Sequence, residues 1–163
     1  MGMEGGAQFS MIIQLVSSVA LGALIGVERR MAHKSAGLRT FALVSLGATL
    51  FTIISLEGAK LIDETFSAAY DPSRIVAQIV SGVGFIGGGI IFFNKSKAHG
   101  VTTAAGLWVA AAVGMAVGFK MYAVAAAAAL ITFSIFTVMM VLERRTELLG
   151  YSKKRESGPT IEN

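Results

Sequence analysis

The feature that most constrains the fold is an uncharged apolar run over residues 75–93. Its 19 residues would rise about 28 Å as a helix, which is enough to cross the hydrocarbon core of a bilayer. The run contains five glycines: Gly82, Gly84, Gly87, Gly88 and Gly89. Glycine costs a helix interior up to about 1 kcal/mol per residue, but in a membrane small residues let helix backbones pack closely. The run therefore predicts a transmembrane helix with packing glycines.

Four other apolar runs occupy most of the remaining chain, and 54% of all residues are hydrophobic. We expect an all-α membrane protein with one transmembrane domain over residues 1–142 and a charged cytoplasmic tail over 143–163. The five expected helices are residues 9–27, 38–56, 75–93, 103–119 and 121–142. No basic residue precedes the first run, so we expect an uncleaved first helix rather than a signal peptide. Cysteine is absent, which excludes disulfides and thiolate metal sites.

The basic residues predict the orientation of these helices. The net charge is +4, but Lys and Arg cluster at the ends of apolar segments, where they indicate topology rather than nucleic-acid binding. Eleven of the 14 lie in the loop between the first two helices, the loop between the third and fourth, and the tail. The positive-inside rule then places the N-terminus outside and the C-terminus in the cytoplasm.

The chain also carries a weak internal repeat. A shift of 63 residues pairs Ser18 with Ser81 and Gly37 with Gly100 without a gap. Such matches fit a parallel two-helix repeat, as in some transporters, in which helices one and two correspond to helices three and four. In a chain this rich in Gly and Ala, chance is the competing explanation.

Charged residues close to a membrane span are costly, so each requires a reason. Glu28 and Arg29 end the first helix, and Arg39 and Thr40 begin the second. One interpretation is structural, with Glu28 paired to Arg39 or Arg30 and the arginines held by lipid phosphates. The other is a cytoplasmic site for an anion or a partner protein, formed with Thr40 at the helix start.

A second polar group opens the third helix. Asp71 suits the N-cap position, and Arg74 and Gln78 are four residues apart on one helix face. This pattern fits either a capped helix or a polar stripe lining a vestibule. Thr102 and Thr103 could cap the fourth helix.

The remaining polar and aromatic candidates have mainly structural interpretations. Asn94 could cap the end of the third helix, and Trp108 could be a packing residue. The two histidines occupy separate loops, which is a weak metal signal. The acidic residues Glu57, Asp63, Glu64 and Asp71 could offer oxygen ligands to magnesium, but a solvated acidic loop is the default explanation. The identity of any metal stays open, and no pattern indicates an enzyme or a cofactor.

Four stretches closely resemble the MgtC/SapB family of bacterial inner-membrane proteins. They are GALIGVERR (22–30), GLRTFALVSLGA (37–48), DPSRIVAQIVSGVGFIGGGIIF (71–92) and GVTTAAGLWVAAAVGMAVG (100–118). The resemblance implies five spans with an external N-terminus, in agreement with the charge count. Several members carry a folded cytoplasmic C-terminal domain, and we expect regulation through that domain to be absent here.

The resemblance also implies a link to growth at low magnesium, and to persistence of pathogens inside phagocytes. Some members are described as modulating the membrane ATP synthase, and the family is often labelled a magnesium transporter. We therefore expect a regulator of a membrane partner complex in the bacterial inner membrane. The alternative is a transporter or channel for magnesium, protons or another small solute, with its path along the third helix. The small-residue pairs Gly22-xxx-Gly26 and Gly84-xxx-Gly88 further suggest a homodimer.

Overall fold

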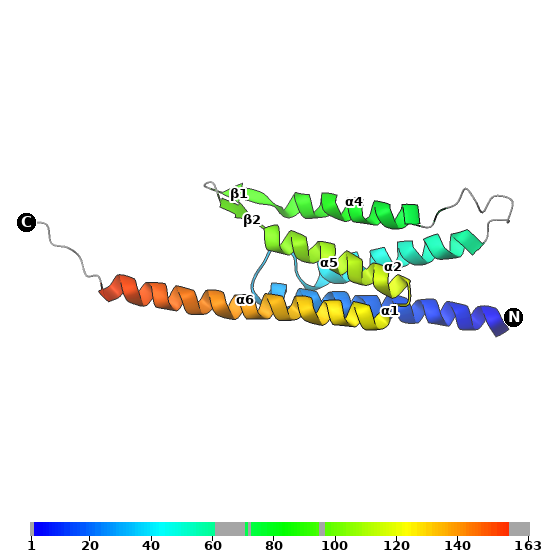
Figure 1. The fold of residues 1–163 in the computed structure, drawn as a ribbon, viewed down its shortest axis with the longest axis horizontal. Coiled ribbons are helices and arrows are strands. Elements are labelled where there is room, and N and C mark those ends of the chain that lie inside the picture. The colour runs from blue at the N-terminus through cyan, green and yellow to red at the C-terminus, as the bar shows by residue number, and fades with distance from the viewer. Residues whose placement is uncertain (1, 61–70, 72, 95–96, 157–163) are drawn as a thin grey trace, which may run out of the picture.

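The protein forms a bundle of five long helices, one of which lies at its edge (Figure 1). The computed structural model describes residues 2–60, 71, 73–94 and 97–156, with side chains described only between residues 5 and 142. The helices are α1 (Gly2–Met31), α2 (Leu38–Lys60), α4 (Ser73–Ile90), α5 (Val101–Gly118) and α6 (Tyr122–Glu156). Two short strands, β1 (Phe92–Asn94) and β2 (Lys97–His99), separate α4 from α5. Each helix contains a stretch long and apolar enough to cross a membrane, so the predicted fold class and its five spans are confirmed.

Helix α5 lies at the centre of the bundle. It packs against α1, α2, α4 and α6. Among the described helices, α4 makes its main contacts with α5 and fewer with α2. Figure 1 shows α4 on the opposite side of α5 from α1 and α6. The main core is correspondingly formed by α1, α2, α5 and α6, with Phe41, Leu107 and Phe136 among its buried side chains.

The two ends of the bundle differ in charge. Helices α1 and α4 end, and α2 and α5 begin, at one end, which carries Arg29, Arg30, Lys34 and Arg39. We call this the basic end, and it is the end that the charge count predicts to be cytoplasmic. The orientation in a membrane and the two-helix repeat both stay predictions. The two helical hairpins are joined differently, by a turn between α1 and α2 and by a strand pair between α4 and α5.

The glycines of α1 and α5 permit close helix packing. A Cβ on Gly22 would lie 2.7 Å from the Phe41 carbonyl oxygen, and one on Gly26 would lie 2.7 Å from the Leu38 Cα. Gly22-xxx-Gly26 therefore packs α1 onto α2 within one chain. The sequence had suggested this pair as a surface for a second copy, but α2 already occupies it. In α5, a Cβ on Gly114 would lie 2.2 Å from the Ser45 carbonyl oxygen of α2.

The glycines of α4 behave differently. Gly87 is buried and lies opposite Ala104 of α5, at an ordinary contact distance. A Cβ on any of the other four would meet no atom within 4 Å: Gly82, Gly84, Gly88 and Gly89. Within the described part of the chain, four of the five predicted packing glycines of this helix thus have no packing partner.

Helix α4 ends at Ile90, three residues before the predicted end of the third span. The β-hairpin that follows pairs Phe92 with His99 and Asn94 with Lys97, where the sequence had indicated a loop. Consecutive glycines weaken the helix and the following aromatic residues favour a strand, which accounts for the change. Gly100 then takes a φ of 84°, and a Cβ there would lie 2.2 Å from the Ile90 carbonyl oxygen. Only glycine satisfies both conditions.

Other connections differ in detail from expectation. Lys120, with a φ of 61°, forms the tight turn expected between α5 and α6. Helix α6 continues past the predicted span end at Leu142 to Glu156, because no proline interrupts this stretch. The apolar residues of 61–70 fall near helical spacing and predict a short interfacial helix, but this stretch lies outside the described residues.

Candidate functional site

The predicted polar residues separate into three groups in space. Glu28, Arg29, Thr102 and Thr103 line one pocket at the basic end. Arg39 and Thr40 lie at the same end but line two other pockets. Asp71 and Arg74 lie at the opposite end, where α4 begins.

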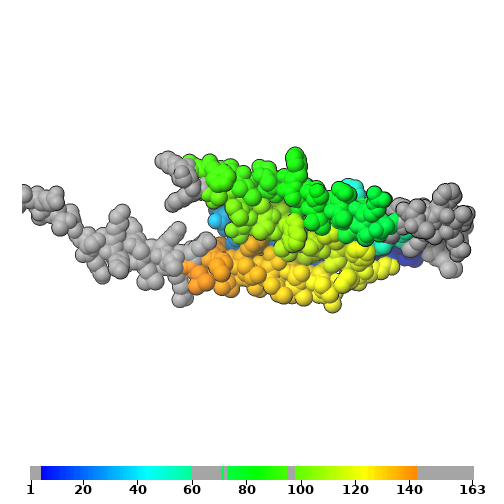
Figure 2. Space-filling model, turned by 45° about the horizontal axis from the view of Figure 1, so that its top comes forward, coloured from blue at the N-terminus to red at the C-terminus, as the bar shows by residue number. Residues whose placement is uncertain are grey.

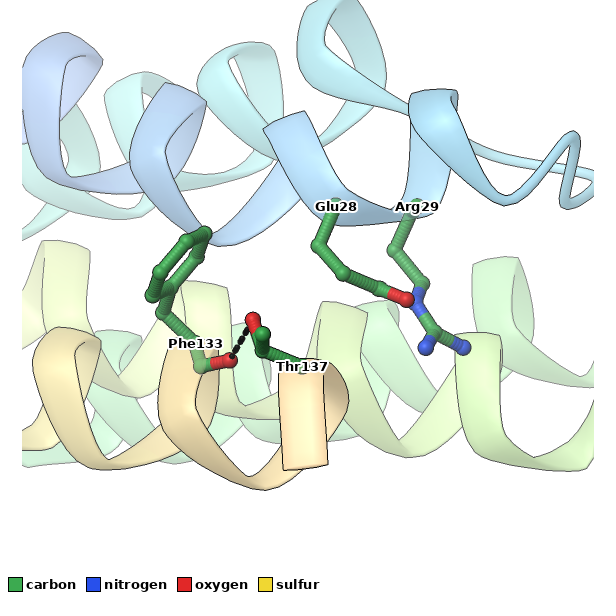
Figure 3. A network of polar contacts seen from close by, with 4 residues as sticks. All are labelled: Glu28, Arg29, Phe133 and Thr137. Carbon is green, nitrogen blue, oxygen red and sulfur yellow. Dashed lines mark hydrogen bonds and ion pairs between the residues drawn. The ribbon is translucent and has the colours of Figure 1, made fainter. Parts of the chain in front are cut away.

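Glu28 and Arg29, both on α1, form an ion pair that is buried inside the bundle. Their side chains are only 2% and 6% exposed, and the Arg29 Nε donates to Glu28 Oε2. Figure 3 shows both side chains directed from α1 towards the space beside α6. The structural interpretation, in which Glu28 pairs with Arg39 or Arg30, is therefore wrong about the partner. The carboxylate is paired with the adjacent arginine on α1 itself and not with the arginine on α2.

Arg29 also contacts an aromatic ring. Its Cζ lies 3.9 Å from the centroid of the Phe136 ring on α6, which is a cation–π geometry. Such a contact contributes about 2 kcal/mol when it is removed from water. Burying a charge is otherwise expensive, so the ring and the carboxylate together explain how this guanidinium is tolerated inside the bundle.

The pair lines a pocket of about 370 Å³ at the basic end. One Glu28 oxygen, Oε1, is buried without a hydrogen-bond partner among the described residues. Lys34, His99, Thr102 and Thr103 contribute the other polar side chains of the wall. This pocket presents both signs of charge, and it suits a small polar molecule or a polar segment of another protein better than a bare cation.

The pocket gathers residues that the sequence treated separately. His99, which the sequence places in a loop, lies in β2 and stacks on Phe92 with ring centroids 5.3 Å apart. Thr103 is buried, while Thr102 is exposed on the same first turn of α5. Neither threonine caps the helix, because Gly100 occupies the N-cap position and no side-chain cap hydrogen bond forms there.

The residues at the start of α4 form a cap rather than a pocket. Asp71 Oδ1 accepts a hydrogen bond of 2.8 Å from the Ser73 amide, and Oδ2 accepts one of 2.8 Å from the Ser73 hydroxyl. These two bonds, and then the charge of Arg74, hold the pKa of Asp71 below its usual value of 3.8. The predicted N-cap is confirmed. Gln78 does not join a vestibule with them, since it lies at the far end of an apolar groove between α2 and α4.

The remaining predicted residues are exposed and stand apart from these groups. Asn94 is exposed in β1, so it does not cap α4. Trp108 is 53% exposed on α5. No group of three or more His, Asp and Glu side chains within the described ranges could hold a metal ion. Of the proposed acidic magnesium ligands, Asp63 and Glu64 lie outside those ranges.

Sequence reasoning missed Gln14, which is only 2% exposed inside α1. Its Nε2 donates to the carbonyl oxygens of Val117 and Gly118, at 2.9 and 2.8 Å. It thereby pairs the Gly118 carbonyl at the end of α5, whereas the Val117 carbonyl also accepts from the Lys120 amide at 2.8 Å. A single amide within an otherwise apolar run was the signal that could have identified it, because an unpaired amide in a membrane is costly. Phe136, one of ten phenylalanines, carries no comparable signal.

Comparison with known proteins places this chain in a family. The MgtC family model matches residues 15–145, which include all five helices in part or whole. This chain belongs to the MgtC family. No solved structure matches it.

Named relatives agree with this assignment. The chain is 48% identical over 112 residues to "Putative magnesium transporter YhiD" of Escherichia coli K12, covering 68% of this chain and 52% of YhiD. It is 36% identical over 148 residues to "Protein MgtC" of Salmonella typhimurium LT2, covering 91% of this chain and 60% of that protein. It is 40% identical over 141 residues to "Protein MgtC" of Brucella abortus, covering 86% of this chain and 55% of that protein. The chain thus spans between half and three-fifths of the length of these relatives, and its family and five apolar helices make it a multi-pass protein of the bacterial inner membrane.

Proposed function

We propose that this protein regulates a membrane partner complex, to which it binds through the free face of α4. The observation that carries the proposal is the row Ala77, Ser81, Gly84 and Gly88. These residues are spaced at i, i+4, i+7 and i+11, so they share one face of the helix, and all four are exposed. Figure 2 shows α4 exposed along its length above α5.

The energetics of α4 support a partner on this face. Each glycine costs the helix up to about 1 kcal/mol relative to alanine, and within the described chain Gly84 and Gly88 gain no packing in return. Helix association in membranes depends on close backbone approach at such small residues. A transmembrane helix of another protein would recover that cost by packing here. The membrane ATP synthase, which the family resemblance suggests as a partner of some members, is the first candidate.

The test is to fill this face without disturbing the bundle. Gly84→Leu and Gly88→Leu place side chains where no atom lies within 4 Å, so the isolated protein should keep its fold. We expect co-purification of the ATP synthase from bacterial membranes in mild detergent to be lost in both variants. Leu130→Ala, on an exposed face of α6, is the matched control and should retain it. Equal recovery of the synthase with all three variants would contradict the proposal.

The same face is also the remaining candidate for the homodimer predicted from the sequence. Gly22-xxx-Gly26 is occupied by α2, which leaves only Gly84-xxx-Gly88 of the two pairs. Crosslinking in native membranes distinguishes the two occupants, because a dimer yields a product of twice the chain mass. If the yield of crosslinked dimer falls when the partner protein is present, the second copy and the partner bind the same face of α4 and exclude each other.

A transport function is the second candidate. It is favoured by the name of the relative YhiD, a putative magnesium transporter, and by the Oε1 of buried Glu28, which has no hydrogen-bond partner among the described residues. Magnesium flux into proteoliposomes tests it, with Glu28→Gln as the variant that removes the charge and keeps the shape. A saturable flux that is lost in this variant would support transport and count against the regulatory proposal.

A further inference from the structure

An apolar groove of about 660 Å³ runs between α2 and α4. Leu43, Ala48 and Phe51 form its wall on α2, and Ile79 and Ile86 form its wall on α4. It is deep because Gly47 and Gly82 face it without side chains, and a Cβ on either would meet nothing within 4 Å. The groove is independent of the small-residue face of α4 on which the proposed function rests.

The groove ends in a cluster of positive charge. Arg39 and Thr40 line its basic end and also line an adjoining pocket of about 340 Å³. Arg30 and Lys34 complete that pocket, and no acidic side chain lines it. Among the described residues, none of these three basic side chains forms a salt bridge. A cationic pocket is thus continuous with an apolar groove.

The length of the groove matches one leaflet of a membrane. From Arg39 to Phe51 along α2, the helix rises about 18 Å at about 1.5 Å per residue. Half of a hydrocarbon core of about 30 Å is about 15 Å. A headgroup held at Arg39 would therefore allow an acyl chain to follow the groove to about the bilayer centre.

We propose that this site binds one anionic phospholipid from the leaflet at the basic end. Its phosphate contacts Arg30, Lys34 and Arg39, and one acyl chain lies between α2 and α4. Basic pockets between transmembrane helices commonly bind such headgroups, and the acyl chain packs against the apolar groove walls by van der Waals contact, as neighbouring helices do in a membrane.

The experiment measures lipid retention by native mass spectrometry of the purified protein in detergent. Phosphatidylglycerol, phosphatidylcholine and inorganic phosphate are titrated in parallel. We expect phosphatidylglycerol to bind at least about tenfold more tightly than phosphatidylcholine, because three cations favour a net negative headgroup. Inorganic phosphate should neither bind comparably nor displace the lipid, because it lacks the acyl chain.

Variants separate the two parts of the site. Gly82→Leu and Gly47→Leu fill the groove, and Arg39→Gln removes a charge from its mouth. Each should weaken phosphatidylglycerol binding about tenfold or more, with an unchanged circular dichroism spectrum. Gly84→Leu, on the opposite face of α4, should bind as the unmodified protein does.

Three results would overturn the proposal. These are equal retention of the two lipids, undiminished binding by both folded groove variants, and inorganic phosphate binding as tightly as the lipid. Loss of partner binding in Gly84→Leu would not affect it, so this proposal and the proposed function can fail separately.

Discussion

Gly114 determines how closely α2 and α5 pack, and replacing it with alanine tests this role. A Cβ there would lie 2.2 Å from the Ser45 carbonyl oxygen, 2.9 Å from its carbon and 3.0 Å from the Ala48 Cβ. Two of these three atoms belong to the backbone of α2, so no side-chain rotation relieves the clash. The two helices must separate along the centre of the bundle.

The expected magnitude follows from two opposing effects. Overpacking of a core costs about 1–3 kcal/mol, and the upper end applies because backbone must move. Replacing a helical glycine with alanine recovers up to about 1 kcal/mol. We therefore expect Gly114→Ala to lower the free energy of unfolding by about 2 kcal/mol. Gly84→Ala meets no atom within 4 Å and should instead raise it by up to about 1 kcal/mol.

The assay is unfolding of the purified protein in mixed micelles by titration with sodium dodecyl sulfate. Trp108, the single tryptophan, lies on α5 and reports the transition by its fluorescence. The two variants should shift the midpoint of this titration in opposite directions. Their free energies of unfolding should differ by about 3 kcal/mol. If Gly114→Ala were as stable as the unmodified protein, the close packing of α2 and α5 described above would be refuted.

Further predictions concern the caps and turns of the bundle. Gln14→Leu should lower the free energy of unfolding by about 1–3 kcal/mol, because it removes the side-chain donor to the last carbonyl of α5. Gln78→Leu, at an exposed position, is the control and should change the free energy of unfolding by less than about 0.5 kcal/mol in the same titration. The pKa of Asp71 is lowered on folding, so the contribution of this carboxylate to stability is complete above its unfolded pKa and is lost as the pH falls through its lower folded pKa. A ¹³C NMR titration of the Asp71 carboxyl should show the lowered pKa. Ser73→Ala should raise that pKa towards 3.8. Gly100→Ala should destabilise the protein, because it combines a positive φ with a Cβ 2.2 Å from a carbonyl oxygen, and thermal aggregation should start at a lower temperature; an unchanged onset would contradict the turn geometry.

The sequence predicts the number and position of the helices because the membrane imposes a length on each apolar run. It also predicts the Asp71 cap, since local chemistry at a helix start requires no knowledge of distant residues. The β-hairpin after Ile90 was not predicted, because Phe92 and Phe93 read equally well as the end of a transmembrane helix. Apolar composition alone does not distinguish a buried helix end from a strand.

The site was harder to predict because its parts come from different helices. The sequence identified Glu28 and Arg29 but not the ring of Phe136, which lies more than 100 residues away on α6. It also treated all glycines of α4 as equivalent packing residues. Which of them face α5, the α2 groove or the exterior depends on how the helix is rotated in the bundle, and only the tertiary structure supplies that rotation.

The central claim, that α4 binds a partner helix, is tested most directly by photo-crosslinking in native bacterial membranes. A photoreactive amino acid is placed at position 84, on the small-residue face, and separately at position 130, on the exposed face of α6. Our account predicts a discrete adduct with one other membrane protein from position 84 and none from position 130. Adducts with lipid alone from position 84, or only with a second copy of this chain, would contradict it.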